Sequence, residues 1–165
     1  MPEQKRRNGR SKNNSLTEAS MVELFIENEK KKGHSVLYAK EIKIYQKKID
    51  LIEISRKKGS GIGDAIGIEF KIRDWQRCLV QAKKNRVLLP LNAIAIWHSH
   101  CMSIDVSYLK STGIGLISVS DSKNSWIVRP AKSKYVDEGI HKKIRANIIS
   151  ENEMLQNSFE MENCL

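Results

Sequence analysis

Seven residues at positions 66–72, Ile-Gly-Ile-Glu-Phe-Lys-Ile, constrain the fold of this chain more than any other stretch. Apolar side chains recur there at every second position, which is the period of a β-strand with one face against a core. Glu69 and Lys71 then share the other face, which we expect to be exposed, and the preceding apolar run contributes Asp50. Two carboxylates that can hold a hard divalent cation, with a lysine beside them, are what metal-assisted phosphodiester cleavage needs.

The length and composition of the chain indicate a globular protein with one core. A chain of 165 residues can bury one sizeable core. No apolar run approaches the roughly 20 residues that span a bilayer, so we expect no membrane segment. The basic, polar N-terminus does not resemble a signal peptide. The three cysteines are odd in number and lack C-x-x-C spacing, which indicates neither a disulfide framework nor a zinc site and favours a reduced, cytoplasmic setting.

The charge of the chain is strongly positive and unevenly distributed. The formal net charge is +10. Residues 1–15 are predicted to be a disordered basic tail, 16–150 a single domain, and 151–165 an acidic C-terminal tail. Because the two tails offset each other, the domain between them is strongly basic. This bias indicates a polyanionic partner, most simply nucleic acid, although a basic structural or partner-binding protein would share it.

Hydrophobic periodicity and turn residues predict an α/β fold, with a central mixed β-sheet flanked by α-helices. Ser15 or Thr17 is expected to cap the first helix, and Gly33 to end it. The other predicted elements are strands at 36–45 and 49–55, a basic glycine-rich loop at 56–64, the strand at 66–72, a helix that Asp74 opens, a strand at 92–97 buried on both faces, a helix at 103–111, a hairpin at 114–120 and 126–128, and a helix at 137–154.

This order of elements, with Asp50 on the second strand and Glu69-x-Lys71 on the third, resembles the PD-(D/E)XK nuclease superfamily over residues 16–128. The resemblance implies a restriction-endonuclease-like core. It also implies that Asp50, Glu69 and the backbone carbonyl of Phe70 ligate Mg²⁺, for which Mn²⁺ substitutes. Lys71 would orient the attacking water or stabilise the charge of the transition state. The plain alternative is that Glu69 and Lys71 form an ordinary cross-strand surface pair.

Two further positions follow from the same resemblance. Many members carry a glutamate on the first helix that completes the metal site; Glu18 fits best, Glu23 is second, and a solvated glutamate at the helix start is the alternative. Gln81 resembles the glutamine of the family's Q-x-x-x-Y motif, where it contacts substrate or orients the site. Asn85 stands where the motif has its aromatic residue.

The leading hypothesis is therefore a Mg²⁺-dependent endonuclease that acts on nucleic acid, with DNA favoured, and a homodimer is compatible with it. The alternative is a non-catalytic nucleic-acid-binding or regulatory module on the same fold. If His98 and His100 lay on a strand, they would share a face as a zinc or catalytic pair, but ordinary strand-end histidines are favoured. The predicted contacts to nucleic acid are Arg56, Lys57, Lys58, Lys83, Lys84 and Arg86.

Overall fold

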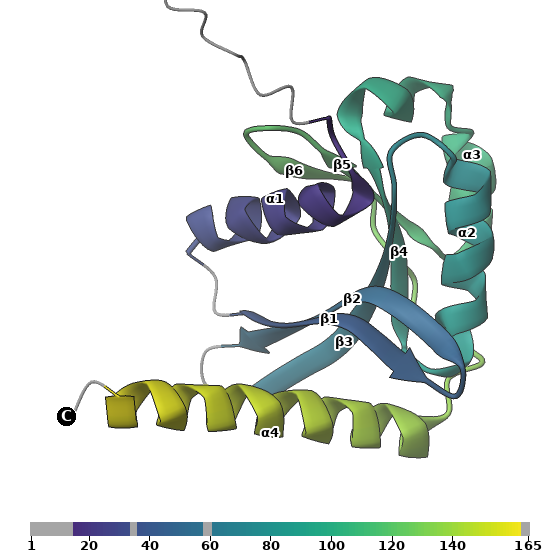
Figure 1. Ribbon diagram of the computed structural model, residues 1–165. Coiled ribbons are helices and arrows are strands. Elements are labelled where there is room, and N and C mark those ends of the chain that lie inside the picture. Colours follow the sequence, from purple (N-terminus) through teal and green to yellow (C-terminus); the bar gives the residue numbers. More distant parts are fainter. Residues whose placement is uncertain (1–14, 34–35, 58–60, 163–165) are drawn as a thin grey trace, which may run out of the picture.

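A six-stranded mixed sheet forms the centre of the protein (Figure 1). The computed structural model describes residues 15–33, 36–57 and 61–162. The strands lie in chain order, β1-β2-β3-β4-β5-β6. The first three strands form an antiparallel meander, and β4 and β5 continue the sheet parallel to β3. Strand β6 is the last strand and runs antiparallel to β5. Their bounds are β1 Val36–Ile44, β2 Lys47–Lys57, β3 Gly61–Lys71, β4 Leu91–Trp97, β5 Gly115–Val119 and β6 Asn124–Val128.

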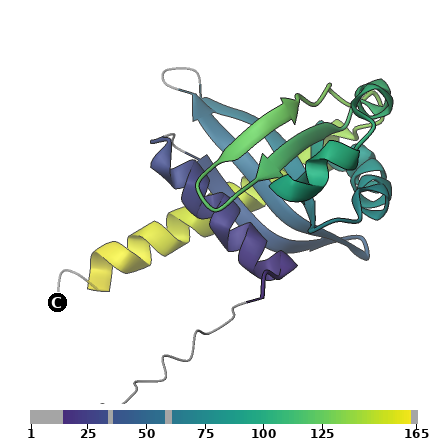
Figure 2. The same ribbon diagram turned by 90° about the horizontal axis from the view of Figure 1, so that it is seen from above.

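Helices cover both faces of this sheet, as the sequence predicts. Helix α1 (Glu18–Lys31) packs on one face, through a core that includes Phe25, Ile68 and Phe70. On the other face, α2 (Trp75–Lys84) and α3 (Val106–Thr112) share one core, and α4 (Glu138–Glu162) packs over β1 to β3. Seen from above, α1 and α4 cross with the sheet between them (Figure 2). Two 3₁₀ helices, η1 (Asn85–Val87) and η2 (His98–Ser103), complete the fold.

Local sequence signals account for the positions at which the first two helices begin. The Thr17 side chain accepts a hydrogen bond from the Ser20 backbone N–H, and the Ser20 side chain accepts one from the Thr17 N–H. This reciprocal capping box confirms Thr17 as the N-cap of α1. Asp74 caps α2 in the expected way, because its carboxylate accepts from the Arg77 N–H at 3.1 Å.

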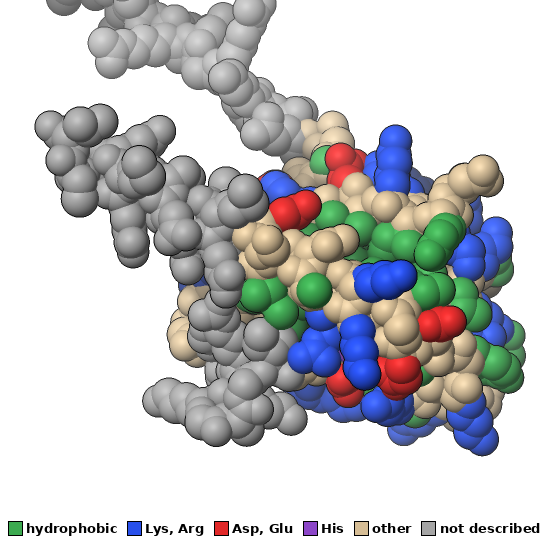
Figure 3. Space-filling view, turned by 90° about the horizontal axis from the view of Figure 1, so that it is seen from below, with side chains coloured by type: hydrophobic (Ala, Val, Ile, Leu, Met, Phe, Trp, Pro, Cys, Tyr) green, Lys and Arg blue, Asp and Glu red, His purple; other side chains and the backbone are tan. Residues whose placement is uncertain are grey.

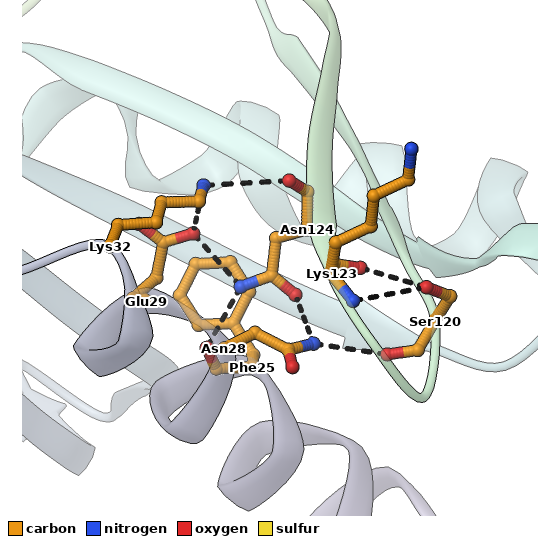
Figure 4. A network of polar contacts seen from close by, with 7 residues as sticks. All are labelled: Phe25, Asn28, Glu29, Lys32, Ser120, Lys123 and Asn124. Carbon is orange, nitrogen blue, oxygen red and sulfur yellow. Dashed lines mark hydrogen bonds and ion pairs between the residues drawn. The ribbon is translucent and has the colours of Figure 1, made fainter.

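A buried polar network fixes the second half of α1 to the β5–β6 hairpin (Figure 4). Asn28 donates to the Ser120 carbonyl at 3.0 Å and to the Asn124 side chain at 3.1 Å. Asn124 donates in turn to the Phe25 carbonyl at 2.8 Å and to Glu29 at 2.9 Å. Both asparagines are buried, so each bond satisfies a group that would otherwise be costly to bury. The network therefore holds the helix that carries Glu18 in one place on the sheet.

Strand β3 differs from its prediction in two respects. Its charged face is covered rather than exposed, because residues 67–70 are all buried. Gly61 and Gly63, which are expected in a loop, instead lie in β3, so that β2 reaches Lys57 and β3 begins at Gly61. Gly67 is closely packed, since a Cβ there would lie 2.7 Å from Leu89 Cδ1, and this side chain would have to shift to admit it. The sequence pattern identified the strand correctly, but the expected exposure of its charged face is wrong, because α2 and η1 contact Glu69 on that face.

Other elements also begin or end at residues that differ from the predicted ones. Tyr45 and Gln46 have left-handed backbone angles, φ 46° and 64°, and form a two-residue hairpin turn between β1 and β2. Helix α3 begins later than predicted, because Asp105 caps it rather than Ser103. Helix α4 continues to Glu162, so residues 151–162, expected to be a tail, are helical. Among the described residues, no helix is both long and apolar enough to cross a membrane.

Candidate active site

Asp50 and Glu69 come together on the neighbouring strands β2 and β3. Leu51 pairs with Ile68 in the antiparallel ladder, so Asp50 and Glu69 lie opposite each other one position further along. Asp50 Oδ2 accepts a hydrogen bond from the Phe70 N–H at 2.9 Å, which turns its carboxylate toward the chain beside Glu69. The two acids that the sequence predicted as metal ligands are thus adjacent, although nineteen positions separate them.

The Glu69 carboxylate is almost completely enclosed, with 1% exposure. Asn85 Nδ2 donates to Glu69 Oε1 at 2.7 Å, and the Cys78 thiol donates to the Glu69 carbonyl at 3.2 Å. Burial raises the pKa of Glu69 well above its usual range, and the neighbouring Asp50 carboxylate raises it further. The bond from Asn85 and the charge of Lys71 oppose this rise. Two carboxylates held this close favour either a shared proton or a bound cation.

Lys71 is paired with Glu18. Its side chain is largely buried, although the sequence pattern predicts an exposed one. Its ammonium lies 2.7 Å from Glu18 Oε2, and its side chain is 15% exposed. The first turn of α1 therefore reaches the end of β3, which brings together two residues 53 positions apart. Glu23, the second choice on this helix, pairs with Lys40 instead. Of the two candidate glutamates, only Glu18 contacts a residue of the Glu-x-Lys motif among the described residues.

A cleft of about 390 Å³ opens beside these residues, between the start of α1 and the β1–β2 hairpin. Asp50, Glu18 and Phe70 contribute to its wall. The other charged residues in the wall are Glu23, Lys40, Glu41 and Lys48. Asp50 lies in the wall of the cleft, whereas Glu69 is buried behind it and is not among the lining residues. Of the two carboxylates, Asp50 is therefore the one that faces the cleft.

Glu41 marks an irregularity in β1 that the sequence did not indicate. It has φ 52°, a left-handed value that residues with side chains rarely adopt. Lys40 pairs with Leu51, and Ile42 pairs with Ile49, so Glu41 lies across from Asp50. Its side chain turns to Lys48 at 2.6 Å. Strained backbone of this kind is found preferentially at functional sites, and here it adjoins the carboxylate pair.

Helix α2 supplies one predicted site residue, Gln81, and its C-cap, Asn85, is a site residue that the sequence does not indicate. Gln81 lies between Cys78 and Asn85 at helical spacing, and those two residues contact Glu69. Its Oε1 atom is buried without a hydrogen-bond partner among the described residues. From the sequence alone, Asn85 is only a departure from the aromatic residue of the Q-x-x-x-Y motif. In the structure its side chain holds the Glu69 carboxylate, and nothing in the motif predicts this contact.

The predicted nucleic-acid contacts that the structure describes do not gather on one surface. Arg56 and Lys57 end β2 at the opposite end from Asp50, and Lys58 lies outside the described residues. Lys83 bonds to the Tyr108 hydroxyl at 3.2 Å, whereas Lys84 is exposed. Arg86 lies 5.1 Å over the Tyr135 ring, away from the cleft. The two lysines in the wall of the cleft, Lys40 and Lys48, are paired with Glu23 and Glu41 respectively.

The two histidines predicted as an alternative site lie apart from any metal-binding cluster in the described residues. His98 and His100 lie in η2 after the end of β4, so they do not share a strand face as the alternative prediction required. Within the described parts of the chain, no cluster of three or more His, Cys, Asp or Glu residues is arranged to hold a metal ion. Asp50 and Glu69 form a pair of protein carboxylates rather than a complete cage of side chains.

Comparisons with known proteins bear on the fold alone. No protein-family model matches the chain. No curated protein matches it either. A solved structure of a protein of unknown function from Silicibacter pomeroyi is similar, with a TM-score of 0.63 and 11% sequence identity. The similarity covers 88% of this chain and 93% of that one, so the two share nearly the whole architecture.

Proposed function

We propose that this protein is a Mg²⁺-dependent endonuclease of the PD-(D/E)XK type that hydrolyses phosphodiester bonds in nucleic acid, with DNA the favoured substrate. The observation that carries the proposal is the placement of Asp50 and Glu69 side by side on β2 and β3, with Asp50 in the wall of a cleft and Lys71 two residues beyond Glu69. An ordinary surface pair would not bury Glu69 to 1% exposure beside a second carboxylate.

The donor set fits a hard divalent cation. Asp50 and Glu69 would hold it, with the Phe70 carbonyl as a third oxygen ligand. Mg²⁺ needs few protein carboxylates because it keeps several waters, so a pair suffices. Burial and the neighbouring Asp50 carboxylate raise the pKa of Glu69, so the pair is difficult to ionise fully, and a bound cation would favour its ionised form. When bound, such a cation neutralises phosphoryl oxygens and makes a coordinated water more acidic.

The protein's own groups supply orientation and charge. Asn85 fixes one oxygen of Glu69, which limits the ways in which this carboxylate can turn. Lys71 places an ammonium beside the pair, and Glu18 holds that ammonium in position. A cation on a largely buried side chain stabilises the additional negative charge of a phosphoryl transition state more strongly than a solvated one. Lys71 is therefore the residue to which we assign this stabilisation.

The charge of the body supports a polyanionic substrate. The chain carries 29 Lys and Arg against 19 Asp and Glu. On the face that includes α4, Lys and Arg side chains are spread among apolar ones, with fewer acidic side chains between them (Figure 3). Such a surface attracts nucleic acid from several directions and explains binding without sequence readout.

The test is a cleavage assay with plasmid DNA, branched DNA and RNA, each in Mg²⁺, Mn²⁺ or EDTA. Wild-type protein should cut in either metal and not in EDTA. Lys71→Met should abolish cutting, whereas Lys43→Met, which removes an exposed lysine from β1, should cut normally. Equal cutting by wild type and Lys71→Met would refute the role of Lys71.

The same assay decides the alternative of a non-catalytic binding module. Binding of nucleic acid by a folded wild-type protein, without cleavage in Mg²⁺ or Mn²⁺ of any of the three substrates, would favour that alternative. Cleavage that persists in EDTA would contradict the proposed dependence on a metal.

A further inference from the structure

A second hollow, of about 330 Å³, lies where η1, the start of β4 and the end of α3 meet the segment between β6 and α4. It shares no lining residue with the cleft beside Asp50. Four of its lining residues are cationic, and none of its lining residues is acidic. The four are Arg86, Lys110, Lys132 and Lys134.

The segment that carries two of these lysines is fixed although it is neither helix nor strand. Ser133 donates from its backbone to the Pro90 carbonyl at 2.7 Å and from its hydroxyl to the Arg86 carbonyl at 2.8 Å. Ala131 donates to the Gly113 carbonyl at 3.0 Å. With Ser133 turned inward, Lys132 and Lys134 lie on either side of it in the wall of the hollow. The basic groups are therefore held in place by backbone contacts and not merely scattered on a loop.

Among the residues that the structure describes, a carbonyl and an aromatic ring orient Arg86, and no carboxylate pairs with it. Its Nε donates to the Lys83 carbonyl at 3.2 Å, and its guanidinium lies 5.1 Å over the Tyr135 ring. Tyr135 itself is 65% exposed, so much of its ring remains open to a planar ligand. An arginine oriented beside an exposed aromatic ring combines a phosphate donor with a stacking surface.

The positive charge of the hollow is poorly compensated. Lys132 lies 3.9 Å from Asp64, a distance at which two exposed groups attract only weakly. Among the described residues, Arg86, Lys110 and Lys134 have no ion pair of this kind. The C-terminal end of α3 accounts for Lys110, since a helix dipole favours a cation there. It does not account for the other three.

We infer that this hollow binds a segment of a nucleic-acid strand, through phosphates held by Arg86, Lys132 and Lys134 and a base stacked on Tyr135. This inference rests on the proposed function and deepens it, by adding a second binding surface, away from the carboxylate pair, for a strand of the same substrate. Basic groups beside an exposed aromatic ring are the arrangement by which proteins bind single strands without reading sequence. A free phosphate or nucleotide would offer the same chemistry, and the experiment separates these sources.

The test is fluorescence anisotropy of a labelled single-stranded oligonucleotide with the full chain in EDTA, at several salt concentrations. Tyr135→Ala should weaken binding by about fivefold or more, as expected when one base no longer has an aromatic ring to stack on. In a plot of the logarithm of the binding constant against the logarithm of the salt concentration, the double variant Lys132→Ala/Lys134→Ala should have a shallower slope. The slope should become less negative by about 0.7 for each phosphate that is no longer neutralised. Lys30→Ala/Lys31→Ala removes the same charge from an exposed part of α1 and should leave the slope nearer to that of wild type.

Equal slopes for the two double variants, or no binding by wild type, would overturn the inference. Competition by inorganic phosphate or a mononucleotide at matched ionic strength, as effective as unlabelled oligonucleotide, would also overturn it and would assign the hollow to a small ligand. Because EDTA prevents metal-dependent cleavage, the measurement does not depend on catalysis. If the expected changes occur in a protein that never cuts, they support this site while the proposed nuclease activity fails.

Discussion

Replacing Glu53 by Gln should stabilise this protein at high pH. Glu53 lies on β2 opposite Tyr38, on the face that α1 covers. Burial, together with the nearby negative charge of Glu29, raises the pKa of Glu53 from 4.5 to about 7, while Lys32 opposes the rise. The folded protein therefore prefers Glu53 protonated, and it carries a buried charge only when the pH exceeds that pKa.

The sign and size of the effect follow from linkage. A raised carboxyl pKa gives stability that is fully present below pH 4.5 and is lost as the pH rises through about 7. At about 1.4 kcal/mol per pKa unit, the loss is about 3 kcal/mol when complete. Glu53→Gln should thus raise the free energy of unfolding by about 3 kcal/mol at pH 8 and by less than about 1 kcal/mol at pH 5.

Urea unfolding followed by circular dichroism at the two pH values measures this difference. Glu27→Gln is the matched control, because it removes the same charge from an exposed position on α1 and should change stability by no more than about 0.5 kcal/mol at either pH. A gain from Glu53→Gln that is the same at pH 5 and pH 8 would refute the argument from burial. Destabilisation at pH 8 would show that the charged carboxylate has a favourable partner.

Three further predictions concern the candidate site and its support. Mn²⁺ at millimolar concentration should raise the melting temperature of wild type but not of Asp50→Asn; an equal rise in both would place the cation elsewhere. Asn85→Ala should cost about 1–3 kcal/mol, because the buried Glu69 carboxyl loses its 2.7 Å donor, and a neutral result in urea unfolding would contradict this. Gly67→Ala should lower the free energy of unfolding by about 1–3 kcal/mol, because the new Cβ would press against the Leu89 side chain. Gly139→Ala, near the exposed start of α4, should lower it by less, and equal losses would refute the packing argument.

Much of the fold could be predicted from the sequence because its signals are local. The alternation around Glu69 identified β3, Thr17 and Asp74 identified the starts of two helices, and the apolar run at 92–97 identified a strand buried on both faces. Period, capping and turn chemistry act over a few residues, so a single segment carries enough information to specify its own element. The α/β class with a mixed sheet follows from the order of those elements.

The assembly of the candidate site was decided by tertiary structure. Asp50 meets Glu69 only through the register of two strands, Glu18 meets Lys71 across 53 positions, and Asn85 reaches Glu69 from the end of α2. The burial of Glu69 depends equally on helices that pack on the second face of β3. Sequence spacing determines which side of a strand a residue faces, but what lies against that side depends on packing between distant segments. For that reason the sequence could indicate which residues belong to this candidate site, while only the folded chain determines their burial and electrostatics.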